Sequence, residues 1–278
     1  MALATTLGTV AGVERLLRPT VGGLLREWRQ QRHMSQLDLA SLAGVSSRHL
    51  SFVETGRARP SREMVLHLAE ELEVPLRERN SLLLAAGYAP AYRTTDLDAE
   101  DMRPVREAID RILASHNPFP AVVVDRGWHM VAANDGVGPL LQGVADELLV
   151  PPVNVLRLTL HPAGMAPRIV NFEEWSQHLL HRLRRQYLLT RDTGTGELYD
   201  ELCSYPGVVG GDSPAEGEAP DLLAVPLRYR TDAGELAFIS TVTTFGTAVD
   251  ITLAELAIEA FLPADAATAA ALHGAAAG

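Results

Sequence analysis

The stretch AGVSSRHLSFVETGRARPS, Ala43–Ser61, decides how the chain is interpreted. It gathers hydroxyl side chains, arginines and a histidine around a few apolar residues, although the chain carries a formal charge of -11. Gly44 ends one short predicted helix, and Ser46 is a good N-cap for the next. Leu50 and Val53 share one side of the second helix, which we expect to be buried. Two short helices joined by a tight turn match the layout of a helix-turn-helix.

Three more helices are predicted around this pair. Apolar residues repeat at helical spacing in residues 21–28, before the pair, and in residues 61–72 and 76–86, after it. Five short helices within residues 20–92 predict a compact all-α domain. Residues 1–19 are expected to be a flexible N-terminus, and the polar residues 93–101 a linker.

A second domain is predicted over residues 102–270, followed by a flexible tail at 271–278. It opens with an apolar seam at helical steps, formed by Met102, Val105, Ile109 and Ile112. This seam either packs against its own domain or forms a dimer contact.

Beyond Pro118 the pattern is typical of strands. PAVVVDRGWHMVAAND predicts a hairpin around Asp125-Arg126-Gly127, and residues 221–230 and 234–247 predict two further strands. Helices are predicted near 134–141, 154–160 and 171–189, with an acidic loop at 207–220. The segment from 251 is expected to be helical at first and to fray after Pro263. These elements predict an α+β domain, an antiparallel sheet with helices on one side.

Composition limits the other possibilities. The single cysteine, Cys203, excludes an internal disulfide and a cysteine-based zinc site. All 24 basic residues are arginine, which we attribute to compositional bias. The N-terminus lacks a signal-peptide pattern, and no apolar run is long enough to span a membrane. We therefore expect a soluble, cytoplasmic protein.

Charge is distributed unevenly along the chain. Residues 24–63 hold seven arginines against four acidic residues, whereas residues 96–278 hold 12 arginines against 26 acidic residues. This asymmetry predicts a basic working face joined to an acidic second domain.

The second helix of the pair has the side chains to read double-stranded DNA. Arg48 can donate two hydrogen bonds to a guanine, serines can bond several bases, and Phe52 can touch a thymine methyl. The predicted base-contacting residues are Ser46, Ser47, Arg48, His49, Ser51 and Phe52, and the predicted phosphate-contacting residues are Gln36, Arg57, Arg59 and Ser61. Periodicity alone equally allows a solvated arginine face, and the module could instead bind protein.

Resemblance favours DNA binding. SQLDLASLAGVSSRHLSFVETGRARPS resembles the core of the Cro/C1-type (XRE-family) helix-turn-helix domains. REMVLHLAEELEVPLRERNSLLLAAGYAPAY, NPFPAVVVDRGWHMVAAND, NVLRLTLHPAGMAPRIVNFEEW, PLRYR and ELAFISTVTTFGTAVDITLAELAIEAFLPADAAT resemble the MmyB-like transcription regulators, over roughly residues 19–270.

This resemblance implies a multidomain chain, with a five-helix DNA-binding domain followed by a PAS-like sensor that binds a small molecule. It implies a homodimer on DNA, and a structural pair between Arg29 and Glu54. One departure is Ala133, where an aromatic or other apolar residue is expected before Asn134.

A ligand pocket in such a domain is expected to be mostly apolar with a few polar anchors. The candidate ligand-contacting residues are Trp128, Met130, Asn134, Arg157, His161, Trp175, Leu179, Phe238 and Phe245. For the apolar ones, ordinary core packing is the alternative. Arg157 and His161 lie one helical turn apart and could together hold the carboxylate of a ligand. We therefore expect the ligand to be a fatty acid or another apolar metabolite. The alternative is that Arg157 is a surface arginine and His161 a helix-ending histidine.

Enzymatic chemistry is not expected. There is no Gly-rich phosphate loop and no G-x-S-x-G elbow. His178 and His181, near Glu173 and Glu174, could suit a metal but fit a polar helix face better, so no metal or other cofactor is predicted. The sequence predicts a ligand-responsive regulator in which the helix at 98–115 transmits the change; a small-molecule hydrolase with an accessory helical domain is the competing class.

Overall fold

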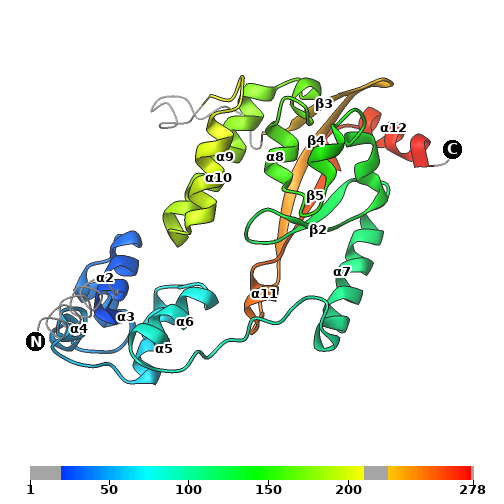
Figure 1. Ribbon diagram of the computed structural model, residues 1–278. Helices are drawn as coiled ribbons and strands as arrows, with labels where there is room; N and C mark the ends of the chain where they lie inside the picture. The colour runs from blue at the N-terminus through cyan, green and yellow to red at the C-terminus, as the bar shows by residue number, and fades with distance from the viewer. Residues whose placement is uncertain (1–19, 210–224, 277–278) are drawn as a thin grey trace, which may run out of the picture. The chain divides into compact units, whose positions relative to one another are not determined.

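The computed structural model describes residues 20–209 and 225–276, and the chain forms two compact units (Figure 1). The first comprises residues up to Thr94 together with Val249–Ile251, and the second the remainder. The predicted flexible segment 1–19 and most of the predicted acidic loop lie outside the described residues.

The first unit contains the five predicted helices. They are α2 (Val21–Gln31), α3 (Gln36–Leu42), α4 (Ser47–Glu54), α5 (Arg62–Glu71) and α6 (Leu76–Ala85). Ser35, Ser46 and Ser61 cap three of them, each accepting a hydrogen bond from the backbone N–H three residues on. The apolar sides meet in one core that includes Leu25, Leu39, Leu50, Val53 and Leu68.

The second unit is built on a five-stranded antiparallel sheet. Its strands are β1 (Ala121–Val124), β2 (Met130–Ala133), β3 (Leu227–Thr231), β4 (Gly234–Thr244) and β5 (Ala257–Pro263), in the order β2-β1-β5-β4-β3. The N-terminal helical region is thus followed by an α+β domain with a curled antiparallel sheet, as in a PAS-like sensor.

The prediction for the C-terminal segment was wrong. The helix from residue 251 ends after one turn, α11 (Ile251–Ala254), and the chain then forms β5, the central strand. Beyond Pro263 it does not fray but forms α12 (Ala266–Ala276). Alanine, glutamate and leucine favour helix locally, but pairing with both β1 and β4 outweighs that preference.

Helices cover both faces of the sheet, not one as predicted. Along β1, Val122 and Val124 belong to one core, whereas Ala121 and Val123 belong to a second. The first core contains residues of α8 (Val155–Leu160), α9 (Phe172–Thr190) and α10 (Thr193–Cys203). The second contains residues of α7 (Arg103–His116), a helix that follows the short 3-10 turn η1 (Glu100–Met102).

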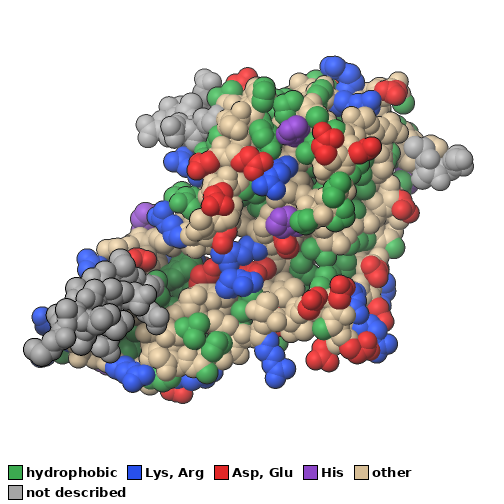
Figure 2. Space-filling view, in the orientation of Figure 1, with side chains coloured by type: hydrophobic (Ala, Val, Ile, Leu, Met, Phe, Trp, Pro, Cys, Tyr) green, Lys and Arg blue, Asp and Glu red, His purple; other side chains and the backbone are tan. Residues whose placement is uncertain are grey.

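The apolar seam predicted at 102–112 is used inside this unit. Met102 and Ile109 are buried, and Ile109 packs with β1 and β5 residues. The opposite side of α7 carries charged side chains, which gather over this helix in Figure 2. Three further 3-10 turns, η2 (Asp135–Leu140), η3 (Asp146–Leu149) and η4 (Ala166–Arg168), complete the unit. No helix in the described ranges is long and apolar enough to cross a bilayer.

Candidate functional site

Helix α4 presents the predicted base-contacting side chains on one open face. Leu50 and Val53 are buried on its inner side. The other predicted residues are outside: Ser46, Ser47 and Arg48 are exposed, and His49, Ser51 and Phe52 are half-exposed. The Arg48 guanidinium lies 5.4 Å from the centroid of the Phe52 ring.

A buried ion pair fixes α4 against α2. Arg29 donates from Nε to Glu54 Oε1 at 2.7 Å and from Nη2 to Oε2 at 2.9 Å. Its Nη1 donates to the carbonyl of Met34 at 2.7 Å. Burial alone would raise the pKa of Glu54, but hydrogen bonds from Arg29 and Gln36 outweigh burial and lower it. Glu54 is therefore held ionised at the end of α4.

Three of the four predicted phosphate-contacting residues also serve the scaffold. Gln36 donates from Nε2 to Glu54 Oε2 at 2.8 Å, a contact that the sequence did not suggest. Arg59 donates to the Ala86 carbonyl at 2.9 Å and lies 5.4 Å from the Tyr88 ring. Arg57 is exposed in the turn after α4, and Ser61 caps α5. Arg57 is thus the phosphate candidate that is exposed without a role in holding the helices together.

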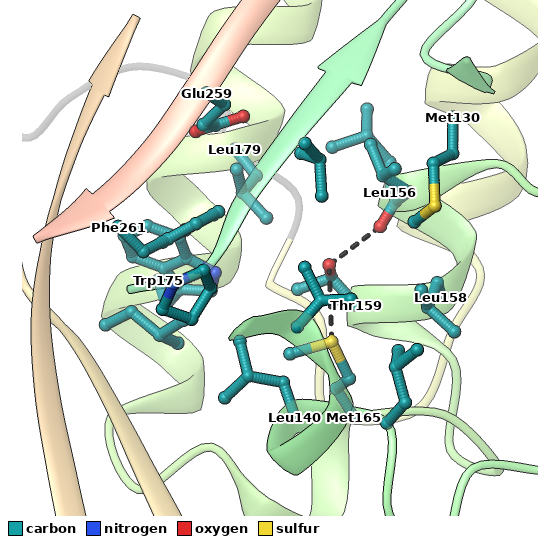
Figure 3. A pocket seen from close by; sticks show the side chains of 16 residues that line it. Met130, Leu140, Leu156, Leu158, Thr159, Met165, Trp175, Leu179, Glu259 and Phe261 are labelled. Carbon is teal, nitrogen blue, oxygen red and sulfur yellow. Dashed lines mark hydrogen bonds between the residues drawn. The ribbon is translucent and has the colours of Figure 1, made fainter. Parts of the chain in front are cut away.

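The second unit contains an apolar cavity of about 60 Å³ between the sheet and its covering helices (Figure 3). Its walls come from β1, β2, β3, β5, η2, α8 and α9. The lining residues are Pro120, Val122, Met130, Val137, Leu140, Leu141, Val155, Leu156, Leu158, Thr159, Met165, Trp175, Leu179, Leu227, Glu259 and Phe261.

Three predicted ligand-contacting residues line this cavity: Met130, Trp175 and Leu179. The other candidates do not line it. Asn134 is buried as a structural anchor, bonded to Ala121, Leu113 and Phe119 backbone atoms. Phe238 is fully buried core, and Phe245 packs in the core on the α7 face. Trp128 is also buried, with its Nε1 donating to Gln186 Oε1 at 2.8 Å.

The carboxylate that Arg157 holds is one of the chain's own. The Arg157 guanidinium donates from Nε and Nη2 to the two carboxylate oxygens of Glu201, on α10, at 2.8 and 2.7 Å. The hydrogen bond from Arg157 lowers the pKa of Glu201, and burial together with Glu201 raises the pKa of Tyr205 to about 12. The His161 ring packs edge-on against Tyr205. Arg157 is thus engaged within the chain, and His161 ends α8, as the alternative to a ligand-binding pair had it. The helix α10, which supplies Glu201, was not predicted.

Glu259 is the charged residue of this lining, and it was not predicted from the sequence. It lies on β5, is 5% exposed, and accepts a hydrogen bond from Arg182 Nη1 at 3.1 Å. The Arg182 guanidinium in turn lies 4.6 Å from the centroid of the Trp128 ring. The predicted helix at this segment hid the signal, because only strand alternation directs Glu259 and Phe261 to one face.

The histidines of α9 lie on a helix face where His178 contacts an aromatic ring. No cluster of metal-ligating side chains is present among residues 20–209 and 225–276. His178 instead stacks on Trp175, with ring centroids 5.4 Å apart, and burial lowers its pKa. A neutral imidazole on an indole is a packing contact.

Family models match most of the chain. Residues 25–79 match a helix-turn-helix model, and residues 105–274 match the ligand-binding domain of MmyB-like transcription regulators. Two curated relatives are uncharacterized HTH-type transcriptional regulators of Mycobacterium bovis and Mycobacterium tuberculosis. Each is 32% identical over 132 residues, which is 48% of this chain and 44% of the relative, so the match spans less than half of each relative's length.

Solved structures give weaker likenesses. The clp gene regulator ClgR from Corynebacterium glutamicum aligns with 37% of this chain and 95% of its own, at 24% identity and a TM-score of 0.22. An RNA-binding light-oxygen-voltage receptor aligns with 94% of this chain and 62% of its own, at 14% identity and a TM-score of 0.28. The family assignment therefore depends on the two family models and not on these structures. This chain belongs to the MmyB-like transcription regulators, with an XRE-type helix-turn-helix followed by the family's ligand-binding domain.

Proposed function

We propose that this protein is a transcription regulator that binds double-stranded DNA as a homodimer and responds to a small, predominantly apolar ligand such as a fatty acid. The observation that carries the DNA-binding half is the open face of α4. Arg48 stands exposed there, on a helix whose inner side is buried and whose end is fixed by the Arg29–Glu54 pair.

The arrangement suits base recognition. A guanidinium at the start of a helix can bond two acceptors of guanine in the major groove, while hydroxyls beside it adapt to neighbouring bases. Exposed Arg57, just beyond the helix, suits a phosphate, which fixes register without reading sequence. Because the whole chain is acidic, these contacts attract DNA only at short range. The two DNA-binding domains of a dimer would together bind the duplex more tightly than one domain does.

The ligand half rests on the apolar cavity within the sheet domain. Its walls are almost wholly hydrocarbon, as expected for a site that buries most of its ligand. We propose that the ligand shifts the arrangement of the two DNA-binding domains through α7. A ligand can do so only by its differential affinity for two arrangements.

The DNA-binding half is tested by mobility shift with the protein's own upstream region. We expect Arg48→Ala to weaken binding by about 1–3 kcal/mol and to relax specificity at one base pair. Arg57→Gln should weaken binding to all sequences alike and reduce the salt slope by about one.

The matched control is Arg228→Ala, which removes the same charge from an exposed site on β3 in the second unit, paired with Glu235 at 2.7 Å. It should leave the shift unchanged. A wild-type protein that ignores duplexes of every sequence at low salt would contradict the proposal. Mass spectrometry of molecules released from purified protein tests the ligand half, where a purely polar extract would count against it.

A further inference from the structure

The guanidinium of Arg48 differs from the other guanidinium groups that lie over aromatic rings. Four arginines of the described residues are placed this way, and three of them, Arg32, Arg59 and Arg182, also donate hydrogen bonds to oxygen atoms of the chain. Arg48 makes no such bond within the described ranges, and its guanidinium lies 5.4 Å from the centroid of the Phe52 ring. An arginine carries five N–H donors. Those of Arg48 are therefore available to an acceptor outside the chain.

The Phe52 ring is a fixed support for this guanidinium. Phe52 follows Arg48 by four residues, so both side chains project from the same side of α4. The Phe52 carbonyl accepts from the backbone N–H of Arg57 at 2.8 Å and from that of Ala58 at 3.0 Å, which fixes the end of the helix. Because a cation is attracted to an aromatic face, the Arg48 guanidinium populates fewer positions than one that is free in solvent.

Contact with the ring leaves the guanidinium able to bond a base. The attraction to the ring uses none of the N–H donors of the planar fork. In the major groove this fork matches O6 and N7 of guanine, and a phenyl ring can contact the methyl group of thymine. Successive base pairs are about 3.4 Å apart, so two side chains that contact each other reach neighbouring pairs.

Building on the DNA binding proposed above, we propose that Arg48 and Phe52 read two adjacent base pairs as one unit. The guanidinium bonds a guanine, and the ring contacts the thymine of the neighbouring pair. Phe52 is also a positioning residue for Arg48, because it holds the guanidinium before DNA binds. The duplex then gains both contacts with little further loss of side-chain freedom.

The test uses the full-length wild-type protein and the duplexes that it selects from a randomised pool. We expect a G·C pair beside a T·A pair in the selected site. In a competition mobility shift, replacing this thymine by uracil removes only the methyl group and should weaken binding about fourfold, the effect of burying one such group. Replacing the guanine by 7-deazaguanine removes the N7 acceptor and should weaken binding about tenfold.

Variants of Phe52 separate the contact from the positioning. Phe52→Ala should bind the uracil and thymine duplexes equally, because the group that touches the methyl is gone. Its loss of affinity on 7-deazaguanine should be about two- to fivefold smaller than that of wild type, since Arg48 is no longer held for the guanine. Phe52→Leu keeps an apolar side chain without a ring, so it should retain part of the uracil effect and lose the positioning. Phe52→Tyr keeps the ring and should retain both effects.

The matched control is Leu42→Ala. Leu42 is an apolar side chain at the end of α3, 54% exposed, and is not among the predicted DNA-contacting residues. Both base replacements should weaken binding of this variant by the wild-type factors. The two replacements also test the wild type itself, so they decide the base contacts even if one variant fails to fold.

The outcomes separate two failures. A wild-type protein that binds uracil and thymine duplexes alike, or a selected site without these neighbouring pairs, would overturn the paired reading and leave DNA binding by α4 standing. A wild-type loss on 7-deazaguanine in both Phe52→Ala and Phe52→Leu would show that Phe52 does not position Arg48. If the wild type shifted no duplex at low salt, the DNA-binding proposal would fail, and this inference with it.

Discussion

Single residues set the stability of the contact between α2 and α4. The side chain of Glu54 is 1% exposed, and its charge is tolerated because Arg29, which is 9% exposed, meets both carboxylate oxygens. A buried charge that loses its partner costs far more than the pair contributes over an apolar alternative. Position 54 is therefore sensitive to a change of one atom.

We predict that Glu54→Gln destabilises the first unit by about 3–5 kcal/mol, because Arg29 is left buried without its counter-charge. Denaturant unfolding measures this change, with exposed Glu70→Gln on α5 as a control expected within about 0.5 kcal/mol of wild type.

The same pair makes the stability of the first unit depend on pH. The pKa of Glu54 is lowered in the folded state, so its contribution to the free energy of unfolding is present above the unfolded pKa and is lost as pH falls through the folded pKa. Equal acid sensitivity of wild type and Glu54→Gln would refute this account.

At the scale of elements, the crossing of α2 and α4 depends on a glycine. A Cβ at Gly22 would lie 2.3 Å from the Val53 carbonyl oxygen and 2.7 Å from that of Glu54. Both are backbone atoms that cannot turn aside. The neighbouring Gly23 would meet only the Thr20 hydroxyl, at 3.2 Å. Close approach of the two helices therefore requires Gly22 but not Gly23.

Gly22→Ala should accordingly destabilise the first unit by about 1–3 kcal/mol, since α4 must move outward. Gly23→Ala should be neutral or stabilise by up to about 1 kcal/mol, because alanine favours helix over glycine. Thermal unfolding of both variants compares them directly. A Gly22→Ala protein as stable as Gly23→Ala would show that the helices do not cross this closely.

The C-terminal strand is the second element to be tested. Ala260 pairs with Ala121 on one side and Thr241 on the other, so proline there removes a ladder bond in the middle of the sheet. We expect Ala260→Pro to cost about 3 kcal/mol or more in the free energy of unfolding. Ala266→Pro, at the first position of α12, should cost little, because that position needs no N–H bond. A loss in Ala260→Pro as small as that in Ala266→Pro would contradict the placement of Ala260 in a strand that is paired on both sides.

At the scale of the whole molecule, each unit carries its own hydrophobic core. The core of the first unit is built from α2–α6 residues, and the two cores of the second lie on opposite faces of the sheet. Units with separate cores can unfold separately. Damage to one is then expected to stay within it.

Peptide-resolved hydrogen exchange tests this independence. In Gly22→Ala, protection should fall throughout residues 20–92 and remain at the wild-type level in β1, β4 and β5. The reason is that no residue of the strands belongs to the helical core. Loss of protection in the sheet of this variant would show that the two units share one cooperative transition.

Elements that depend on local sequence patterns were predicted, and those that depend on distant segments were predicted only in part. The five helices of the first unit and strands β1 to β4 were predicted from local periodicity and caps, and the exposed face of α4 followed from them. The pocket was only partly predicted: Met130, Trp175 and Leu179 line it, whereas Arg157 turns to Glu201. Glu259 was not predicted to line the pocket, because the residues around it favour a helix when only local sequence is considered.

By itself, the sequence determined what neighbouring residues decide together: helix ends, turns, apolar faces and the family resemblance that these patterns carry. Only the tertiary structure decided that residues 257–263 form β5, that a cavity lies against this strand, and that Glu259 pairs with Arg182. The physical reason is range. A cap or an apolar stripe is settled within a few residues, whereas a central strand and a pocket wall exist only once distant segments pair, and that pairing can outweigh local preference.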